Sequence, residues 1–354
     1  MQVTAAVVEA KHAAFRLETL ELAEPAPDEL VVRVAASGIC QTDVHGRDDY
    51  FGIAFPCVFG HEGAGVVERT GAAVTKVAPG DRVVMTSPSC GGCVACLRGL
   101  PGYCASSRRI KFGGRLRDGR APFHRNAQPI SGAFFQQSSF ATHALATDGN
   151  VVKVPDDVPL EQAAAFPCGV NTGAGAVFNV LRPQPGSSIV IFGAGAVGLA
   201  ALMAARIAGC ATIAVVDLHD NRLQLARELG ATHVSKEKPA GAFDFALEAA
   251  GSPVALRQAV ECLAPLGVCC LVGSARKGTD VALEMPFLQQ GRTVRGCIQG
   301  DAPGDAFMPA LFEHWRSRRM PVERLITYYE FAEVNRAIAD SLSGKAVKPV
   351  LRIS

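Results

Sequence analysis

Residues 188–198, SIVIFGAGAVG, carry the strongest local structural signal in this chain. An apolar, β-branched strand at residues 188–192 leads into a G-x-G-x-x-G turn, and the alanine-rich residues that follow are typical of a helix. Glycine permits a tight turn at Gly193, close approach to a phosphate at Gly195, and close packing of helix on strand at Gly198. The free N–H groups at the start of such a helix bind phosphate oxygens. The sequence therefore predicts a dinucleotide-binding site here.

A carboxylate follows at the distance that this motif requires. A second predicted strand, residues 212–216, ends in Asp217, nineteen residues after Gly198. An aspartate at that place accepts hydrogen bonds from the adenosine ribose and repels a 2′-phosphate, so the sequence favours NAD(H) over NADP(H). The alternative interpretation is that Asp217 only caps the following helix, which is a common role of aspartate.

The pattern of alternating strands and helices extends from residue 188 to residue 273. Such alternation predicts βαβ units and a doubly wound parallel sheet. The expected strands are residues 188–192, 212–216, 243–247 and 267–272, and the expected helices are residues 196–208, 220–229 and 253–263.

The residues before about 155 have a different character. Short apolar or alternating runs, separated by Gly, Pro and Asp, predict a β-rich domain. We expect residues 105–137, which are polar and rich in Gly and Arg, to form an irregular excursion on the surface. The expected strands are residues 3–8, 30–35, 65–68 and 82–85, with helices near 304–319 and 331–342 and a strand near 347–352.

Composition excludes several classes of protein. The 354 residues suffice for two domains, and 49% hydrophobic with 19% charged residues exclude a disordered chain. A formal net charge of +2 gives no sign of a nucleic-acid partner. The uncharged run at residues 189–205 approaches the length of a membrane span, but its glycines favour a strand followed by a helix, so no membrane partner is expected. Glu9 and Lys11 interrupt the N-terminal apolar stretch, so we expect a cytoplasmic protein.

Four of the twelve cysteines crowd into fifteen residues, at Cys90, Cys93, Cys96 and Cys104. Four thiolates complete a tetrahedral shell around Zn²⁺ and leave no open position, so the spacing favours a structural zinc site. Disulfides are disfavoured in the expected compartment. An iron–sulfur cluster has similar ligand spacing and stays an alternative, whereas a C₂H₂ finger is excluded because no histidine pair follows.

Cys40, His61 and Cys168 offer a second, open set of ligands. Each alone has an ordinary alternative, because a cysteine in an apolar setting is usually core and a histidine beside glycines often lies in a turn. Together, two thiolates and one imidazole leave one coordination position for water or substrate, as in a catalytic zinc site.

The chain resembles the zinc-containing medium-chain alcohol dehydrogenases over essentially its whole length. The resemblance implies an α/β fold, with a GroES-like β-rich catalytic domain of residues 1–160 and 297–354 and a Rossmann domain of residues 161–296. It also implies NAD(H) and two zinc ions per subunit, one catalytic and one structural. The shared motifs are Cys40-x-Thr42-Asp43-x-His45, Gly60-His61-Glu62-x-x-Gly65, the four cysteines, Cys168-Gly169-x-x-Thr172-Gly173 and residues 193–198.

The resemblance implies a role for each matched residue. Cys40, His61 and Cys168 would hold the catalytic zinc, with Glu62 behind the metal and Asp43 orienting His61. Thr42 would take the proton of the alcohol, and His45 would pass it to solvent. The remaining cofactor contacts that the resemblance implies are those of Asp217, Arg222, Thr172, Val272, Gly273 and Lys348, the last at the pyrophosphate.

Three segments, residues 133–153, 291–305 and 344–352, resemble those of bacterial aryl and allylic alcohol dehydrogenases of the benzyl alcohol and geraniol type. This similarity favours primary alcohols attached to a ring or a double bond as substrates, with Phe51 and Ile298 as candidate pocket residues. The length between Cys104 and Cys168 resembles that of family members that are more often homodimers than homotetramers.

Two alternatives accompany this interpretation. A formaldehyde dehydrogenase acting on a thiol adduct shares the metal motifs, and Arg108, Arg109 and Lys111 could bind the carboxylates of the thiol, although a basic run is more often a solvated face. A non-catalytic NAD(H)- or zinc-binding protein is the alternative of another class. One departure from the family is Gln41, where a basic residue would help to bind pyrophosphate, so we expect weaker NAD(H) binding.

Overall fold

The computed structural model describes residues 1–354, which divide into two compact units. The first unit comprises Met1–Cys168, Pro303–Arg316 and Val322–Ser354, and the second comprises Gly169–Ala302 and Ser317–Pro321. The expected boundaries at 160/161 and 296/297 differ from this division by a few residues. The reason is local packing: helix α4 (Leu160–Ala163) packs on strands of the first unit, and the side chain of Asn179 donates to the backbone at Gly300 in the second.

The second unit is built on one sheet of six parallel strands in the order β13-β12-β11-β14-β15-β16. Numbered along the chain, this is the order 3-2-1-4-5-6 of a doubly wound dinucleotide-binding sheet, which confirms the predicted fold class. The strands are β11 (Ser188–Phe192), β12 (Thr212–Val216), β13 (His233–Ser235), β14 (Phe243–Glu248), β15 (Leu263–Leu271) and β16 (Thr293–Gly296).

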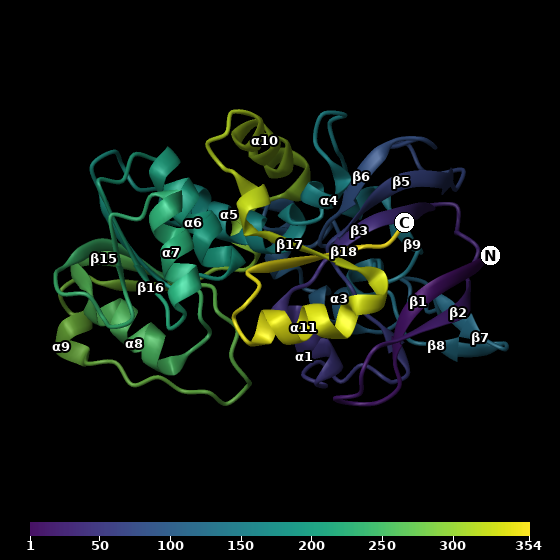
Figure 1. Cartoon of the computed structure of the whole chain (residues 1–354), viewed down its shortest axis with the longest axis horizontal. Coiled ribbons are helices and arrows are strands. Elements are labelled where there is room, and N and C mark those ends of the chain that lie inside the picture. Colours follow the sequence, from purple (N-terminus) through teal and green to yellow (C-terminus); the bar gives the residue numbers. More distant parts are fainter. The chain divides into compact units, whose positions relative to one another are not determined.

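Helices α6 and α8 pack on this sheet, as Figure 1 shows in teal and green. Gly230, with φ +102°, ends α7 in the left-handed conformation that glycine adopts without strain. Ser252 caps α8, its Oγ accepting the Ala255 N–H at 3.5 Å. α8 ends earlier and β15 begins earlier than expected. The helices are α5 (Asn171–Gly175), α6 (Ala196–Ile207), α7 (Asp220–Leu229), α8 (Pro253–Glu261) and α9 (Met285–Leu288), with π-helical segments Phe166–Val170 and Ala176–Leu181.

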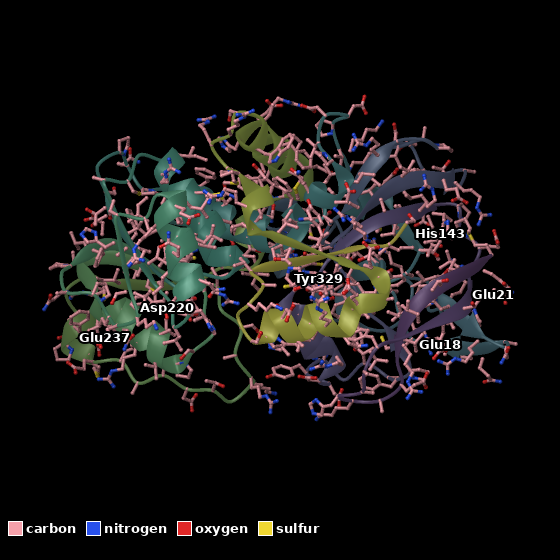
Figure 2. The ribbon with its side chains drawn as sticks, viewed as in Figure 1. Glu18, Glu21, His143, Asp220, Glu237 and Tyr329 are labelled. Carbon is pink, nitrogen blue, oxygen red and sulfur yellow. The ribbon has the colours of Figure 1, made fainter.

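Two mainly antiparallel sheets form the first unit, in the orders β4-β1-β2-β7-β8 and β10-β6-β5-β3-β18-β17, with β9 also pairing with β3. In β2, Leu20 is buried while Glu21, labelled in Figure 2, is exposed, as period-two alternation requires. The strands are β1 (Gln2–Val8), β2 (Arg16–Leu22), β3 (Glu29–Gly38), β4 (Cys57–Val58), β5 (Gly63–Thr70), β6 (Arg82–Met85), β7 (Phe123–Arg125), β8 (Gln128–Ile130), β9 (His143–Thr147), β10 (Val151–Lys153), β17 (Ile326–Glu330) and β18 (Lys348–Arg352).

The C-terminal segment, yellow in Figure 1, belongs to this first unit. Strand β18 pairs antiparallel with β3 and parallel with β17. The helices of the unit are α1 (Gln41–Arg47), α2 (Val94–Leu97), α3 (Ser107–Phe112), α4, α10 (Gly304–Arg316) and α11 (Val334–Leu342). No helix of either unit has the length and apolar character needed to cross a membrane.

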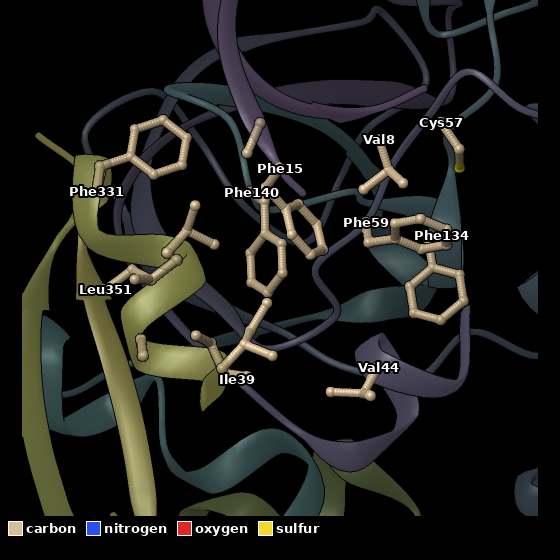
Figure 3. Packing of buried hydrophobic residues seen from close by; sticks show 14 of the residues in the cluster. Val8, Phe15, Ile39, Val44, Cys57, Phe59, Phe134, Phe140, Phe331 and Leu351 are labelled. Atoms are coloured by element: carbon tan, nitrogen blue, oxygen red, sulfur yellow. The ribbon is translucent and has the colours of Figure 1, made fainter. Parts of the chain in front are cut away.

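An aromatic core lies beside these sheets in the first unit (Figure 3). The rings of Phe15 and Phe140 meet edge to face at 5.8 Å, and those of Phe59 and Phe134 do so at 5.2 Å. Such pairs add to the stabilisation that burial of their area provides. This core adjoins the segment that carries Cys40 and His61, so it fixes the backbone there.

Residues 105–137 are not the irregular surface excursion that the sequence suggested. They contain α3, β7 and β8, and several of their side chains are buried. Gln136 explains part of the difference, because its buried amide donates to the carbonyls of Ile110 at 2.9 Å and Arg115 at 3.0 Å. Hydrogen bonds of this kind within the segment give its buried polar groups partners, so these residues can be buried without an unpaired donor or acceptor.

Candidate active site

Cys40, His61, Glu62 and Cys168 come together in the first unit, with one ligand atom of each within 4.8 Å of the others. The sulfur atoms of Cys40 and Cys168 lie 3.7 Å apart. Two thiolates on a tetrahedral zinc ion, each at about 2.3 Å, lie roughly 3.8 Å from one another. Cys40 precedes α1 and Cys168 lies in a π-helical segment, a kind of irregularity often found at functional sites.

The imidazole of His61 is held in one orientation by Asp43. Its Nδ1 lies 2.8 Å from Asp43 Oδ1, which also accepts the Gly60 N–H at 3.1 Å, while Oδ2 accepts the Cys40 N–H at 2.9 Å. The other ring nitrogen, Nε2, is buried and has no hydrogen-bond partner. A buried polar atom without a partner is costly, so Nε2 facing the two sulfur atoms fits a metal ligand.

An Asp43→Asn variant is expected to lose about 10- to 100-fold in zinc retention or activity. The three donors around Asp43 need two carboxylate oxygens, and an amide offers one oxygen and a competing N–H₂ group. Zinc remaining after dialysis against a chelator, together with kcat/KM, measures the effect. Asp48→Asn serves as the control, because Asp48 pairs with His12 and Arg47 instead. Equal zinc retention in the two variants would contradict the role of Asp43.

Lys348 lies beside the candidate metal site. Its ammonium forms a buried ion pair with Glu62 and donates to the Ile39 carbonyl at 3.3 Å. Its contact with a pyrophosphate stays a prediction. Burial raises the pKa of Glu62, although the Lys348 ammonium favours the carboxylate. Gly38 makes room for this pair, because a Cβ there would lie 2.0 Å from Glu62 Oε2.

The loop at residues 133–138 is part of the site, and its backbone conformation could not be predicted from residue types. Ala133, Phe135, Gln136 and Ser138 all have φ between +47° and +53°, a region that L-residues rarely adopt. This backbone places the ring of Phe135 against the His61 imidazole, with centroids 4.6 Å apart. Strain of this kind persists where the surrounding structure enforces it and is frequent at functional sites.

Gln137, from the same loop, forms hydrogen bonds with the backbone of the segment that carries His61 and Glu62. Its Nε2 donates to the His61 carbonyl at 3.0 Å and its Oε1 accepts the Gly63 N–H at 3.1 Å. These bonds clamp the backbone on both sides of Glu62. Gln137 therefore fixes the backbone that carries two of the candidate metal-site side chains, His61 and Glu62.

The four cysteines of residues 90–104 also converge, with their sulfur atoms within 4.8 Å of one another. Cys93 and Cys96 lie 3.5 Å apart, and Cys90 and Cys96 lie 3.9 Å apart. The Ala105 N–H donates to Cys93 Sγ and the Cys90 N–H to Cys104 Sγ. Hydrogen bonds from backbone N–H groups lower the pKa of Cys93 to about 6. Four converging sulfurs fit a closed tetrahedral zinc site, and every cysteine of the chain is a free thiol.

The glycine motif lies at the carboxyl end of β11 in the second unit. Gly193 has φ +98°, and a Cβ on Gly198 would lie 1.8 Å from the Gly193 carbonyl oxygen, so both positions require glycine. A Cβ on Gly195 would meet nothing within 4 Å. Gly195 is the N-cap of α6 without a side-chain cap, and therefore leaves space and N–H donors for a phosphate.

Asp217 sits at the carboxyl end of β12, next to this motif. Its Oδ2 accepts the Ala194 N–H at 2.6 Å and its Oδ1 accepts the His219 N–H at 2.9 Å. Arg222 lies 4.0 Å from Asp217. The structure thus brings the predicted ribose-binding residues together. Asp217 does not cap the following helix, whose N-cap is His219 without a side-chain cap, so the alternative interpretation is not supported.

The remaining predicted residues fall on both units. Thr42 and His45 are on α1 of the first unit, and the His45 ring stacks on Tyr50 at 4.1 Å. Tyr50 is a neighbour that sequence motifs do not reveal. Phe51 joins the aromatic residues beside His61 by stacking on Phe112 at 4.0 Å. Thr172, Val272, Gly273 and Ile298 belong to the second unit, where the N–H groups of Val272 and Gly273 both donate to the Glu248 carbonyl.

Comparison with known proteins agrees with this geometry. Residues 26–156 match the alcohol dehydrogenase GroES-like domain, and residues 196–313 match the zinc-binding dehydrogenase domain. Geraniol dehydrogenase of Castellaniella defragrans is 38% identical over 98% of this chain and 96% of that protein. Benzyl alcohol dehydrogenase of Acinetobacter calcoaceticus is 39% identical with a TM-score of 0.96, covering 100% of both chains.

A third relative is the alcohol dehydrogenase zinc-binding domain protein of Burkholderia ambifaria, whose structure has a TM-score of 0.97 at 43% identity. It covers 100% of this chain and 99% of its own. Matches to both domains, and to relatives of nearly the same length, extend over the two units described above. The chain therefore belongs to the zinc-type medium-chain alcohol dehydrogenase family.

Proposed function

We propose that this zinc-type alcohol dehydrogenase oxidises primary aryl or allylic alcohols to aldehydes with NAD⁺, reversibly. The observation that carries the proposal is the open ligand set: Cys40 and Cys168 at tetrahedral spacing, with the unpartnered Nε2 of His61 beside them. Three protein ligands leave one position for the hydroxyl, which is what an alcohol dehydrogenase needs. The converging four cysteines support a second, structural zinc.

The cofactors supply the reactive centres, and the chain positions them. When bound, zinc acts as a Lewis acid on the alcohol oxygen and NAD⁺ accepts the hydride. Asp43, whose Oδ1 lies 2.8 Å from His61 Nδ1, leaves the Nε2 of His61 as the nitrogen that would bind the metal. Thr42, whose Oγ1 lies 3.7 Å from Cys40 Sγ, is placed to take the hydroxyl proton, and His45 three residues further along α1 is placed to pass it on.

A Thr42→Val variant is expected to lose about 10²- to 10⁴-fold in kcat, the range that general acid–base catalysis contributes. Valine has nearly the same shape as threonine but no hydroxyl, and Thr42→Ser keeps the hydroxyl and should retain most activity. Steady-state kinetics with benzyl alcohol measures the difference, and fluorescence titration with NADH checks that cofactor binding is intact. Equal activity of the serine and valine variants would contradict the proton-transfer role.

Aromatic side chains beside the metal site support the substrate class. Phe134 meets the His61 ring edge-on at 5.7 Å, and Phe135 stacks on it at 4.6 Å. The centre of the Phe112 ring lies 5.9 Å from that of Phe134 and 5.4 Å from that of Phe135. Phe134 and Phe135 are buried, whereas Phe112 and its stacking partner Phe51 are only partly buried and can offer a flat surface to an aryl or conjugated group. The printed activities of the geraniol and benzyl alcohol relatives are of this kind, which also supports the proposal.

Reduction of NAD⁺ at 340 nm with a panel of alcohols tests the proposal. The panel contains benzyl alcohol, cinnamyl alcohol, geraniol, ethanol and S-hydroxymethylglutathione, each before and after chelation and with NADP⁺ in parallel. We expect chelator-sensitive turnover that favours the conjugated alcohols and NAD⁺. Preference for the thiol adduct would favour the formaldehyde dehydrogenase alternative, and absence of turnover by zinc-loaded, NAD⁺-bound protein would favour a non-catalytic role.

With Gln41 we expect a lower affinity for NADH than a basic residue at this position would give. It is the exposed first residue of α1, so a longer basic side chain fits there without burial. In Gln41→Arg, a charge-assisted hydrogen bond to a phosphate should tighten NADH binding roughly three- to tenfold. Fluorescence titration and stopped-flow release measure this, with Gln41→Met as the neutral control. An unchanged dissociation constant and release rate in Gln41→Arg would refute it.

The proposal also includes a cytoplasmic location and assembly as a homodimer. Two clusters of reduced thiols support a reducing compartment, because metal-binding cysteines must stay free of disulfides. The length of chain between Cys104 and Cys168 supports the dimer over the tetramer. Mass determination by light scattering distinguishes the two assemblies.

A further inference from the structure

Glu248 is a buried carboxylate that takes no part in the proposed chemistry. It is the last residue of β14, it is fully buried, and it pairs with Phe192, the residue before the glycine motif on β11. In the strand order 3-2-1-4-5-6 these two strands flank the point where the order reverses, and dinucleotides bind at the carboxyl ends of the strands there. A carboxylate is costly to bury, so Glu248 needs partners that offset its desolvation.

The partners of Glu248 are backbone N–H groups of two neighbouring loops. Its Oε1 accepts the Ala250 N–H at 2.9 Å and the Ser252 N–H at 3.3 Å, in the loop that follows β14. Its carbonyl oxygen accepts the N–H groups of Val272 and Gly273, at 2.9 Å and 3.0 Å, in the loop that follows β15. Burial raises the pKa of the Glu248 carboxyl, while backbone N–H groups of both loops favour its charged form. One residue therefore holds the ends of β14 and β15 together.

The loop that follows β14 packs closely against Gly273 and against Gly193. A Cβ on Gly273 would collide with Glu248 Oε2 and with the Gly251 nitrogen, so the second carboxylate oxygen faces the backbone directly. A Cβ on Gly193 would lie 3.0 Å from the Ala250 nitrogen. This loop is therefore in contact with the glycine motif on one side and with the residues after β15 on the other.

We propose that Glu248 is a positioning residue for the cofactor, because it fixes the backbone at Val272 and Gly273 against which the nicotinamide ring binds. This inference rests on the proposed function, since it takes NAD(H) to bind at the glycine motif with residues 272–273 along the nicotinamide. Glu248 is buried and acts through the N–H groups that it holds. The adenosine half of the cofactor should be less sensitive to Glu248, because Asp217 lies at the end of β12, on the other side of β11.

A comparison of NADH with ADP-ribose tests the proposal, because ADP-ribose differs from NADH only by lacking the nicotinamide. The measured quantity is the ratio of the Kd of ADP-ribose to the Kd of NADH, from calorimetric and fluorescence titration. In Glu248→Gln we expect this ratio to fall about tenfold, the size of one hydrogen bond to a charged group, while the Kd of ADP-ribose changes less than about threefold. Glutamine keeps the shape of glutamate, but its N–H₂ group cannot accept a bond from a backbone N–H.

Two further variants separate cofactor positioning from stability. Asp244→Asn makes the same change at the other end of β14, where Asp244 Oδ2 accepts the N–H and the hydroxyl of Ser188, each at 2.8 Å. It should leave the ratio unchanged, whatever its effect on the melting temperature. Gly273→Ala disturbs the contact with Glu248 from the opposite side and should lower the ratio as Glu248→Gln does. The double variant should lose no more than the larger single loss, because both changes act on one contact.

The outcomes distinguish this inference from the function on which it rests. A wild-type ratio near one, an unchanged ratio in Glu248→Gln, or equal weakening of both ligands in that variant would overturn the positioning role. Failure of the wild-type protein to bind NADH at all would refute the proposed function itself. Hydrogen exchange of the wild type decides the question even if the variants do not fold. NADH should slow exchange in peptides covering residues 249–252 and 272–274 more than ADP-ribose does, and equal protection by the two ligands would overturn the inference.

Discussion

A Cys168→Ala enzyme is expected to lose alcohol oxidation by roughly three orders of magnitude, about 4 kcal/mol of transition-state stabilisation at 1.36 kcal/mol per tenfold. The Cys40 and Cys168 sulfur atoms, 3.7 Å apart, are two of the three proposed ligands of the open site. Removal of one ligand would weaken metal binding and leave the coordination geometry undefined. The hydroxyl would then no longer be held where the metal can activate it. Zinc content measured by mass spectrometry should fall from two ions per chain to one.

Cys57→Ala is the matched control for this experiment. Cys57 is fully buried in the same unit, and burial raises the pKa of its thiol above the ordinary value, so it behaves as a small apolar residue. It should keep two zinc ions and nearly full activity, at some cost in stability. If Cys168→Ala kept both ions or normal turnover, the assignment of the open site to Cys168 would be wrong.

A Cys93→Ser variant is expected to lose the other zinc ion and to melt roughly 5–10 °C lower than the wild type, because a structural zinc contributes folding free energy directly. Few buried apolar side chains are available to hold residues 90–104 together: Val94 is 73% exposed and Leu97 is 75% exposed. The proposed zinc would therefore take the place of a hydrophobic core in this segment. Differential scanning calorimetry and zinc content measure the effect.

Cys210→Ser provides the comparison, since Cys210 is half-buried, belongs to neither sulfur cluster and should tolerate the change. Limited proteolysis adds a local test, because residues 90–113 of Cys93→Ser should become the first site of cleavage. A variant with one zinc fewer but an unchanged melting temperature and cleavage pattern would show that the segment is held by something other than the metal.

The parts of the fold that sequence predicts well are those that local chemistry determines. Strand β11, the glycine turn and α6 follow from a β-branched run, three glycines and an alanine-rich helix within twenty residues. The cluster of four cysteines at residues 90–104 can be predicted equally well, because metal geometry restricts both residue type and spacing. These features need no knowledge of how distant segments meet.

The features that sequence missed depend on contacts between distant segments. The loop at residues 133–138 adopts positive φ at four non-glycine positions, for which no residue pattern exists, because tertiary packing enforces it. The ion pair of Lys348 with Glu62 could not be predicted, because the two residues lie 286 positions apart in the sequence. Lys111 belongs to a basic run of the kind that is typical of an exposed face. It is buried because α3 packs on Phe134 and Phe135.

Strand β18 has a consequence for the order in which the protein can be made. A ribosome releases the metal ligands and the buried Glu62 long before it releases Lys348, which supplies the opposite charge. Until then β3 also lacks its neighbour along residues 36–38. In a nascent chain the Glu62 carboxylate therefore lacks its counter-charge, and the β3 edge that pairs with β18 is unpaired. An unpaired strand edge favours aggregation or binding by chaperones. The ion pair between Glu62 and Lys348 can therefore form only after residue 348 has been synthesised, even though the candidate metal ligands lie in the first half of the chain.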